Sequence, residues 1–163
     1  VLPAGDDNRG LASDYFAAQF DSAGYLHIVF RNTKGQICYV KSKEANQGAN
    51  AYTFDKSVVI AENGSWIELT MDGATPYVAY LSKINTYDGI QIAYYDANLV
   101  KTWNDDGSEN EKGAWNVMTA AMQNRSSAAR ACVAVAPSTV TDWKAAVGYT
   151  PGNVYRVVKY IDK

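Results

Sequence analysis

The stretch FAAQFDSAGYLHIVF (residues 16–30) decides the fold, because the chain repeats its pattern. A short apolar strand is followed by an Asp-Gly turn and by a second apolar strand that ends in an aromatic residue. The stretch IELTMDGATPYVAY (residues 67–80) has the same order. Asp21 and Asp72 therefore stand at equivalent turns about 50 positions apart, and a period of about 20–50 residues is typical of solenoids, propellers and other repeat architectures.

Each unit continues into a third strand, QICYV (residues 36–40) in the first and QIAYY (residues 91–95) in the second, and a weaker third copy follows. These segments are rich in Val, Ile, Tyr and Phe and are bounded by Gly, Asn, Asp and Pro, which favours β-strands. The repeat predicts strands at 15–21, 25–31, 36–42 and 52–61, at 66–72, 76–82, 90–96 and 114–122, and at 129–136, 143–150 and 154–161.

The predicted fold class is all-β, with three four-stranded antiparallel blades of an incomplete β-propeller, the third blade lacking its outer strand. A closed propeller needs about four to eight blades, so three cannot close. One propeller segment is expected, divided into an arm (1–12), two blades (13–62 and 63–122) and a partial blade (123–163). The arm reads as a loose segment or a strand donated elsewhere.

Two segments are ambiguous within this organisation. Residues 97–113 are polar and are expected to form a long insertion between two strands. Residues 114–131 are rich in Ala and favour a helix by propensity, but the register of the repeat predicts a strand, a loop and a strand there.

Composition excludes several classes of protein. With 163 residues and 47% hydrophobic residues, the chain is long enough for a substantial core. A net charge of −2 gives no basic surface for nucleic acid or for an anionic membrane. No apolar run reaches the ~18 residues that a membrane span needs. The first residue is Val1 rather than Met, which suggests a processed or excised piece.

No motif for catalysis, a metal or a cofactor is present, so none is predicted. His27 is the only histidine, and it is expected to pack between blades with its ring nitrogens on backbone groups. The acidic residues at 104–111 suggest a solvated loop, because an EF-type alignment places Thr102 and Gly113 at ligand positions. Cys38 and Cys132 lie in apolar strand contexts and are expected to be buried free thiols.

Carboxylates at the turns are expected to be structural. An Asp at a turn normally accepts hydrogen bonds from nearby backbone N–H groups, and we expect this of Asp21 and Asp72. Glu68 is more unusual, because it stands where the first unit has the small Ala17. It is expected to line the central channel or to be solvated by it.

A ligand would be met where the loops around the channel gather on one face. Aromatic, amide and charged side chains in these loops are what sugar or peptide binding uses. The candidate ligand-binding residues are Arg31, Lys34, Trp66, Glu68, Tyr87, Asp88 and Arg125.

The phrase at 21–30, followed by QICY at 36–39, resembles the blade repeat of bacterial secreted and cell-surface β-propellers of the sialidase-like type. The stricter Asp-box signature of that group, Ser-x-Asp-x-Gly-x-Thr-Trp, is absent, as is a set of strand-end arginines. The resemblance therefore implies a secreted, cell-surface or periplasmic protein and a non-catalytic binding or scaffold module. Its propeller would be completed by another protein chain, either a hetero-partner or a second copy. The leading alternative is a fragment of a propeller glycosidase whose catalytic residues lie elsewhere. A third possibility is a purely structural subunit that completes a larger assembly.

Overall fold

The computed structural model describes residues 5–6, 11–48, 51–84, 87–103, 106, 109–123, 131–135, 145–149 and 156–159. Within these residues every regular element is a β-strand, and all pairs of neighbouring strands are antiparallel. The prediction of an all-β antiparallel fold is confirmed.

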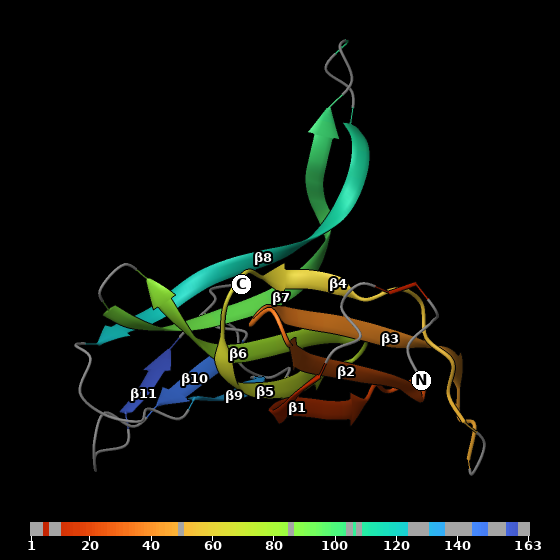
Figure 1. The fold of residues 1–163 in the computed structure, drawn as a ribbon. Helices are drawn as coiled ribbons and strands as arrows, with labels where there is room; N and C mark the ends of the chain where they lie inside the picture. The colour runs from red at the N-terminus through yellow and green to blue at the C-terminus, as the bar shows by residue number, and fades with distance from the viewer. Residues whose placement is uncertain are drawn as a thin grey trace.

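The strands form three separate sheets in chain order (Figure 1). The first sheet contains β1 (Leu11–Phe20), β2 (Tyr25–Asn32), β3 (Ile37–Ala45) and β4 (Val58–Ala61). The second contains β5 (Ser65–Asp72), β6 (Thr75–Ile84), β7 (Tyr87–Trp103) and β8 (Glu109–Gln123). The third contains β9 (Ala131–Val135), β10 (Ala145–Tyr149) and β11 (Arg156–Lys159). No sheet closes on itself.

The prediction that residues 97–113 form a loop is wrong. β7 and β8 continue through most of it as a two-stranded ribbon, in which Val100 pairs with Lys112 and Trp103 with Glu109. Val, Thr and Trp in this segment have high β propensity, which explains the extension. Figure 1 shows the ribbon projecting away from the three sheets. The predicted strand over 114–122 is confirmed within β8, and residues 124–130 lie outside the described residues.

The fourth strand of the first sheet is shorter than predicted, because the chain before it is held by another partner. The backbone N–H and the hydroxyl of Ser57 donate to the carboxylate of Asp6, over 2.7 and 2.8 Å. Asp6 belongs to the predicted arm and is buried. After an isolated bridge between Phe54 and Ser42, pairing with β3 therefore resumes only at Val58.

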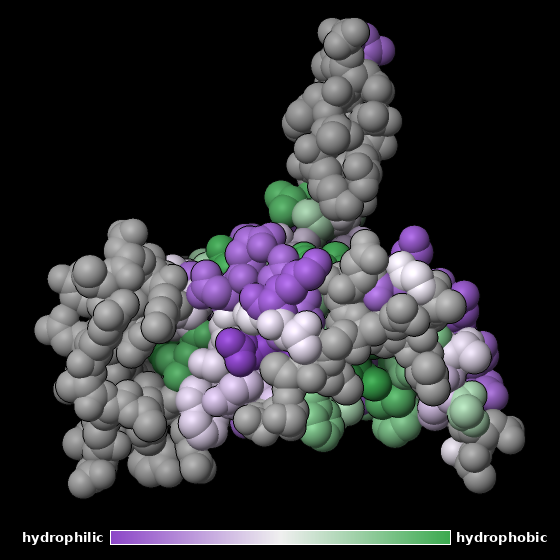
Figure 2. Space-filling model, viewed as in Figure 1, coloured by the Kyte–Doolittle hydropathy of each residue, from purple (hydrophilic) through white to green (hydrophobic). Residues whose placement is uncertain are grey.

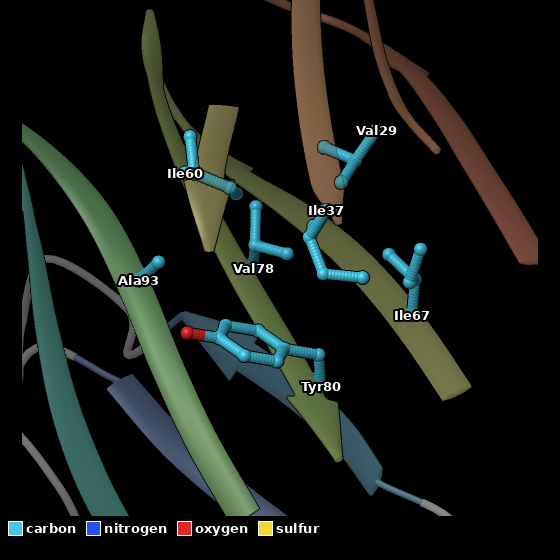
Figure 3. Packing of buried hydrophobic residues seen from close by; sticks show 7 residues of the cluster. All are labelled: Val29, Ile37, Ile60, Ile67, Val78, Tyr80 and Ala93. Atoms are coloured by element: carbon cyan, nitrogen blue, oxygen red, sulfur yellow. The ribbon is translucent and has the colours of Figure 1, made fainter. Parts of the chain in front are cut away.

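The first two sheets pack face to face through apolar side chains. Those from the first sheet are Val29, Ile37 and Ile60, and those from the second are Ile67, Val78, Tyr80 and Ala93 (Figure 3). Burying one such Val or Ile side chain stabilises a fold by about 1.5–3 kcal/mol. This interface fixes the position of the second sheet on the first.

The second sheet is the middle layer of the fold. Successive side chains of a strand point to opposite faces, and in β6 both sets are buried. Val78 and Tyr80 pack toward the first sheet, whereas Tyr77 and Ala79 join a second cluster with Ala145 of the third sheet. The first strands of the three sheets follow one another in space, β1 against β5 and β5 against β9.

The opposite face of the first sheet has a small core of its own. Phe30, Cys38 and Val40 pack there with Phe54, from the segment that connects β3 to β4. The Cys38 thiol is free and buried, and burial raises its pKa to about 11. The prediction for Cys38 is confirmed, whereas the side chain of Cys132 lies outside the described residues.

Gly64 provides a test of the packing between the first two sheets. A Cβ atom added there would lie 2.6 Å from Cγ1 of Ile37 and 3.0 Å from the ring of Tyr80. We expect Gly64→Ala to lower the free energy of unfolding by about 1–3 kcal/mol through overpacking. Denaturant titration measures this, and Ile37→Ala should relieve part of the loss in the double variant. Strictly additive effects of the two substitutions would contradict the packing shown here.

Candidate functional site

The turn between β1 and β2 is organised by the carboxylate of Asp21. Its Oδ1 atom accepts hydrogen bonds from the backbone N–H groups of Ala23 and Tyr25, each over 2.9 Å. Gly24 completes the turn with a φ of 86°, a left-handed conformation that glycine adopts without strain. The predicted capping role of Asp21 is confirmed.

The turn between β2 and β3 is capped in the same way, by the amide side chain of Asn32. Oδ1 of Asn32 accepts hydrogen bonds from the backbone N–H groups of Lys34 and Gln36, over 3.0 and 2.9 Å. Gly35, three residues after Asn32, has a φ of 87°. The capping role of Asn32 was not predicted from the sequence, although Asn32 and Gly35 have the same spacing as Asp21 and Gly24 and could have indicated it.

Asp72 does not cap its turn, so the predicted equivalence with Asp21 is wrong in this respect. Asp72 pairs directly with Thr75 across a two-residue turn and is exposed. The cap at Asp21 uses the N–H of the fourth residue after it. Four residues after Asp72 stands Pro76, which has no N–H to donate.

A buried chain of side chains leads from the first turn into the space between the sheets. Oδ2 of Asp21 lies 3.1 Å from Nε2 of His27, and Nδ1 of His27 lies 2.8 Å from the Tyr39 hydroxyl. An ionised carboxylate only accepts, so in this arrangement Nε2 of His27 donates to Asp21 and the Tyr39 hydroxyl donates to Nδ1. The prediction that His27 is buried is confirmed, but its recorded partners are side chains rather than backbone.

Burial sets the protonation states of this chain. It lowers the pKa of His27, and the hydrogen bond to Asp21 only partly opposes this effect. Burial would raise the pKa of Asp21, but hydrogen bonds from Tyr25, His27 and Ala23 hold it below its usual value. At neutral pH the three groups are therefore a carboxylate, a neutral imidazole and a neutral phenol.

The order Tyr39, His27, Asp21 has the form of a nucleophile, a base and an orienting acid. An activated nucleophile needs a lowered pKa or a base that is free to take its proton. Burial instead raises the pKa of Tyr39, and the charge of Asp21 adds to this effect. This raised pKa does not suit a nucleophile. We refer to the hydrogen-bonded chain of Asp21, His27 and Tyr39 as the tether, because it links the first turn to β3.

A cleft of about 800 Å³ opens beside this tether, between the outer parts of the first two sheets. We refer to it as the inter-sheet cleft. Trp115 of β8 lies edge-on to Tyr39 of β3, with ring centroids 4.8 Å apart, and to Tyr95 of β7 at 6.2 Å. The lining residues are His27, Tyr39, Lys41, Val58, Val59, Ile60, Ala74, Pro76, Tyr95, Gly113, Ala114 and Trp115.

Lys41 carries the positive charge of the inter-sheet cleft. Its Nζ atom lies 3.5 Å from Oδ2 of Asp21 and 4.2 Å from the centre of the Tyr25 ring. The side chain is 39% exposed, so the ammonium also faces solvent.

Arg31 and Trp66, two of the predicted ligand-binding residues, lie outside the inter-sheet cleft, and both contact the ring of Tyr15. The guanidinium of Arg31 lies 5.8 Å from the centre of the Tyr15 ring, and Trp66 packs edge-on to the same ring at 5.7 Å. Lys34 and Glu68 are exposed, the first in the turn after β2 and the second in β5.

The side chains of the other three predicted ligand-binding residues lie outside the described residues. Tyr87 and Asp88 belong to β7, but their side chains lie outside the described residues, as does the whole of Arg125. The residues of the inter-sheet cleft were not predicted. No local pattern marks them, because Tyr39 and Trp115 come together only when two sheets pack.

The part of the chain that the structure describes contains no group of three or more potential metal ligands. Nor does it contain a helix long and apolar enough to cross a membrane. No family model, curated protein or solved structure matches this chain.

Asp21 and Asp72 form a matched pair for testing the tether. We expect Asp21→Ala to lower the free energy of unfolding by about 2–4 kcal/mol, because it removes two turn hydrogen bonds and leaves the ring of His27 buried without its partner. Asp72→Ala should change it by less than about 0.5 kcal/mol. Equal effects in denaturant titrations would contradict the different roles assigned to the two carboxylates.

The lowered pKa of His27 predicts that acid destabilises the fold. The unfolded chain binds a proton at His27 from about pH 6.5 downward, whereas the folded chain does so only at lower pH. The free energy of unfolding should therefore fall below about pH 6.5, by at most about 1.4 kcal/mol per pH unit. Because His27 is the only histidine, His27→Gln should flatten this dependence between pH 5.5 and 7. An unchanged slope in that variant would assign the effect to another group.

Proposed function

We propose that this chain is a non-catalytic binding or scaffold module whose three sheets are propeller blades, completed by another chain or segment. The order of the strands supports the proposal. β1, β5 and β9 lie against one another, and β4 and β8 form the opposite edges of their sheets. Radially arranged blades place their first strands together at the centre and their last strands at the rim.

The observation that carries the proposal is the difference between equivalent positions in β1 and β5. In the repeat, Phe16 corresponds to Ile67 and Phe20 to Met71. Ile67 is 7% exposed, because it packs on the first sheet. Phe16 and Phe20, in contrast, are 69% and 53% exposed. Met71 is half-buried. An exposed aromatic side chain such as Phe16, at a position that is buried in the next unit, marks a surface that another sheet would cover.

The face of β1 that carries these residues points away from the second sheet. Tyr15 and Ala17 pack toward the cluster between the first two sheets, so Phe16 and its alternate neighbours lie on the other face. In Figure 2, hydrophobic residues gather along the lower rim of the molecule, in the region of β1 and β2. We call the surface formed by Phe16, Ala18 and Phe20 the β1 outer face.

The partner that fits the β1 outer face is another antiparallel sheet, supplied by a different protein or by a second copy of this chain. Two copies would give six blades related by two-fold symmetry, whereas a different protein would complete the ring without symmetry. A secreted or cell-surface location belongs to the same proposal and rests on the resemblance of the blade sequence.

Light scattering on the purified chain tests this proposal. We expect a mass above the 17.8 kDa of one chain, and a return toward that mass in the double variant Phe16→Ser, Phe20→Ser. Val117→Ser is the matched control, because Val117 is 41% exposed on the edge strand β8. A stable monomer that unfolds cooperatively and is unaffected by the Phe substitutions would contradict the proposal.

A further inference from the structure

Two strand edges border the inter-sheet cleft. Val58, Val59 and Ile60 all line it, although successive side chains of a strand point to opposite faces. Val59 packs in the small core with Phe30 and Phe54, on the face of the first sheet that is turned away from the second sheet. Ile60 packs in the core between the first two sheets. Three consecutive residues can line one cleft only along the edge of their strand, so the backbone of β4 borders the inter-sheet cleft. The same holds for Gly113, Ala114 and Trp115 of β8.

Both strands stand last in their sheets, so among the described residues each has a ladder partner on one side only. An unpaired edge presents N–H and C=O groups to which another strand can add. Proteins that avoid such pairing place charged residues or Pro in the edge strand. β4 has neither, because its sequence is Val-Val-Ile-Ala.

The side chains of the cleft indicate the chemistry of an added strand. Tyr95, 40% exposed, and Trp115, half-buried, provide aromatic surface opposite Val58, which is 49% exposed. Among the described residues that line the cleft, none carries a carboxylate. The Lys41 ammonium has three donors, and Asp21 is its one recorded carboxylate neighbour. A negatively charged group entering the cleft would find a partner there.

A sugar fits this lining less well than a polypeptide. Sugar hydroxyls need several donors and acceptors, but none of the lining residues that the structure describes is Asp, Glu, Asn or Gln. The two ring nitrogens of His27 are already occupied by Asp21 and Tyr39. The backbone of an edge strand, in contrast, supplies regularly spaced donors and acceptors for another backbone.

We propose that the inter-sheet cleft binds an extended acidic segment of another polypeptide, which pairs with the edge of β4 that has no ladder partner among the described residues. One acidic side chain lies near Lys41, and an apolar or aromatic side chain on the same face of the segment packs on Trp115 and Tyr95. This inference deepens the binding role in the proposed function, but it does not require that a ring be completed.

An array of acetylated, amidated heptapeptides with randomised positions tests the proposal, with the purified chain as the labelled probe. We expect enrichment of Asp or Glu at one position and of aliphatic or aromatic residues two positions away. The best peptide is then made with N-methyl groups on alternate amides. Methylation of one set should weaken binding at least tenfold, because only one edge of the peptide pairs with β4, while methylation of the other set should have little effect.

Variants of the chain separate the contributions of the cleft. Trp115→Ala should weaken binding of the best peptide at least tenfold, and Lys41→Gln should abolish the preference for acidic residues. Val117→Ser is the matched control on β8 and should bind like the unaltered chain. Circular dichroism confirms that each variant is folded.

Three results would overturn the proposal: no peptide bound above the level of the Trp115→Ala variant, no enrichment of acidic residues, or equal effects of the two methylation patterns. Binding of an oligosaccharide panel in place of the peptides would assign the cleft to sugars. None of these results depends on the mass of the chain in solution, so the cleft and the β1 outer face can fail independently.

Discussion

The structure depends on the burial of the second sheet on both of its faces. A strand such as β6, in which Tyr77, Val78, Ala79 and Tyr80 are all buried, has no polar face to turn toward water. Its sheet is stable only as a middle layer, with the first sheet on one side and the third on the other. Two groups of polar residues are compatible with this packing, because they form hydrogen bonds within the protein. They are the turn capped by Asp21 and the tether from Asp21 through His27 to Tyr39.

The strands and their order could be predicted from the sequence, because alternation and turn residues are local signals. The cap at Asp21 was predictable for the same reason. Asp72 does not cap its turn because Pro76 has no N–H group, and this single residue is easily overlooked in two units that otherwise share a pattern. The inter-sheet cleft could not be predicted, since Tyr39 and Trp115 are brought together only by the packing of two sheets. The ribbon at 97–113 was missed because its polar composition outweighed its β-branched and aromatic residues.

Two surfaces follow from this layered arrangement, and they are physically independent. We propose that the β1 outer face is one half of a sheet-on-sheet interface, because the exposed Phe16 stands where the repeat has the buried Ile67. The inter-sheet cleft is bordered by strand edges and is suited to backbone pairing. His27 and Tyr39 line this cleft, and the hydrogen bond between the Tyr39 hydroxyl and Nδ1 of His27 orients the Tyr39 ring. In the two proposals, the chain would join a larger assembly through the β1 outer face and bind a peptide segment in the inter-sheet cleft.

The packing of the first two sheets is tested most directly by nuclear Overhauser effects between aromatic rings. Tyr39 and Trp115, with ring centroids 4.8 Å apart, join the two sheets near the cleft, and Tyr15 and Trp66, at 5.7 Å, join β1 to β5. The structure predicts cross-peaks between the ring protons of both pairs. Strand pairing within each sheet without either set of cross-peaks would mean that the sheets fold without stacking, and this would contradict the account.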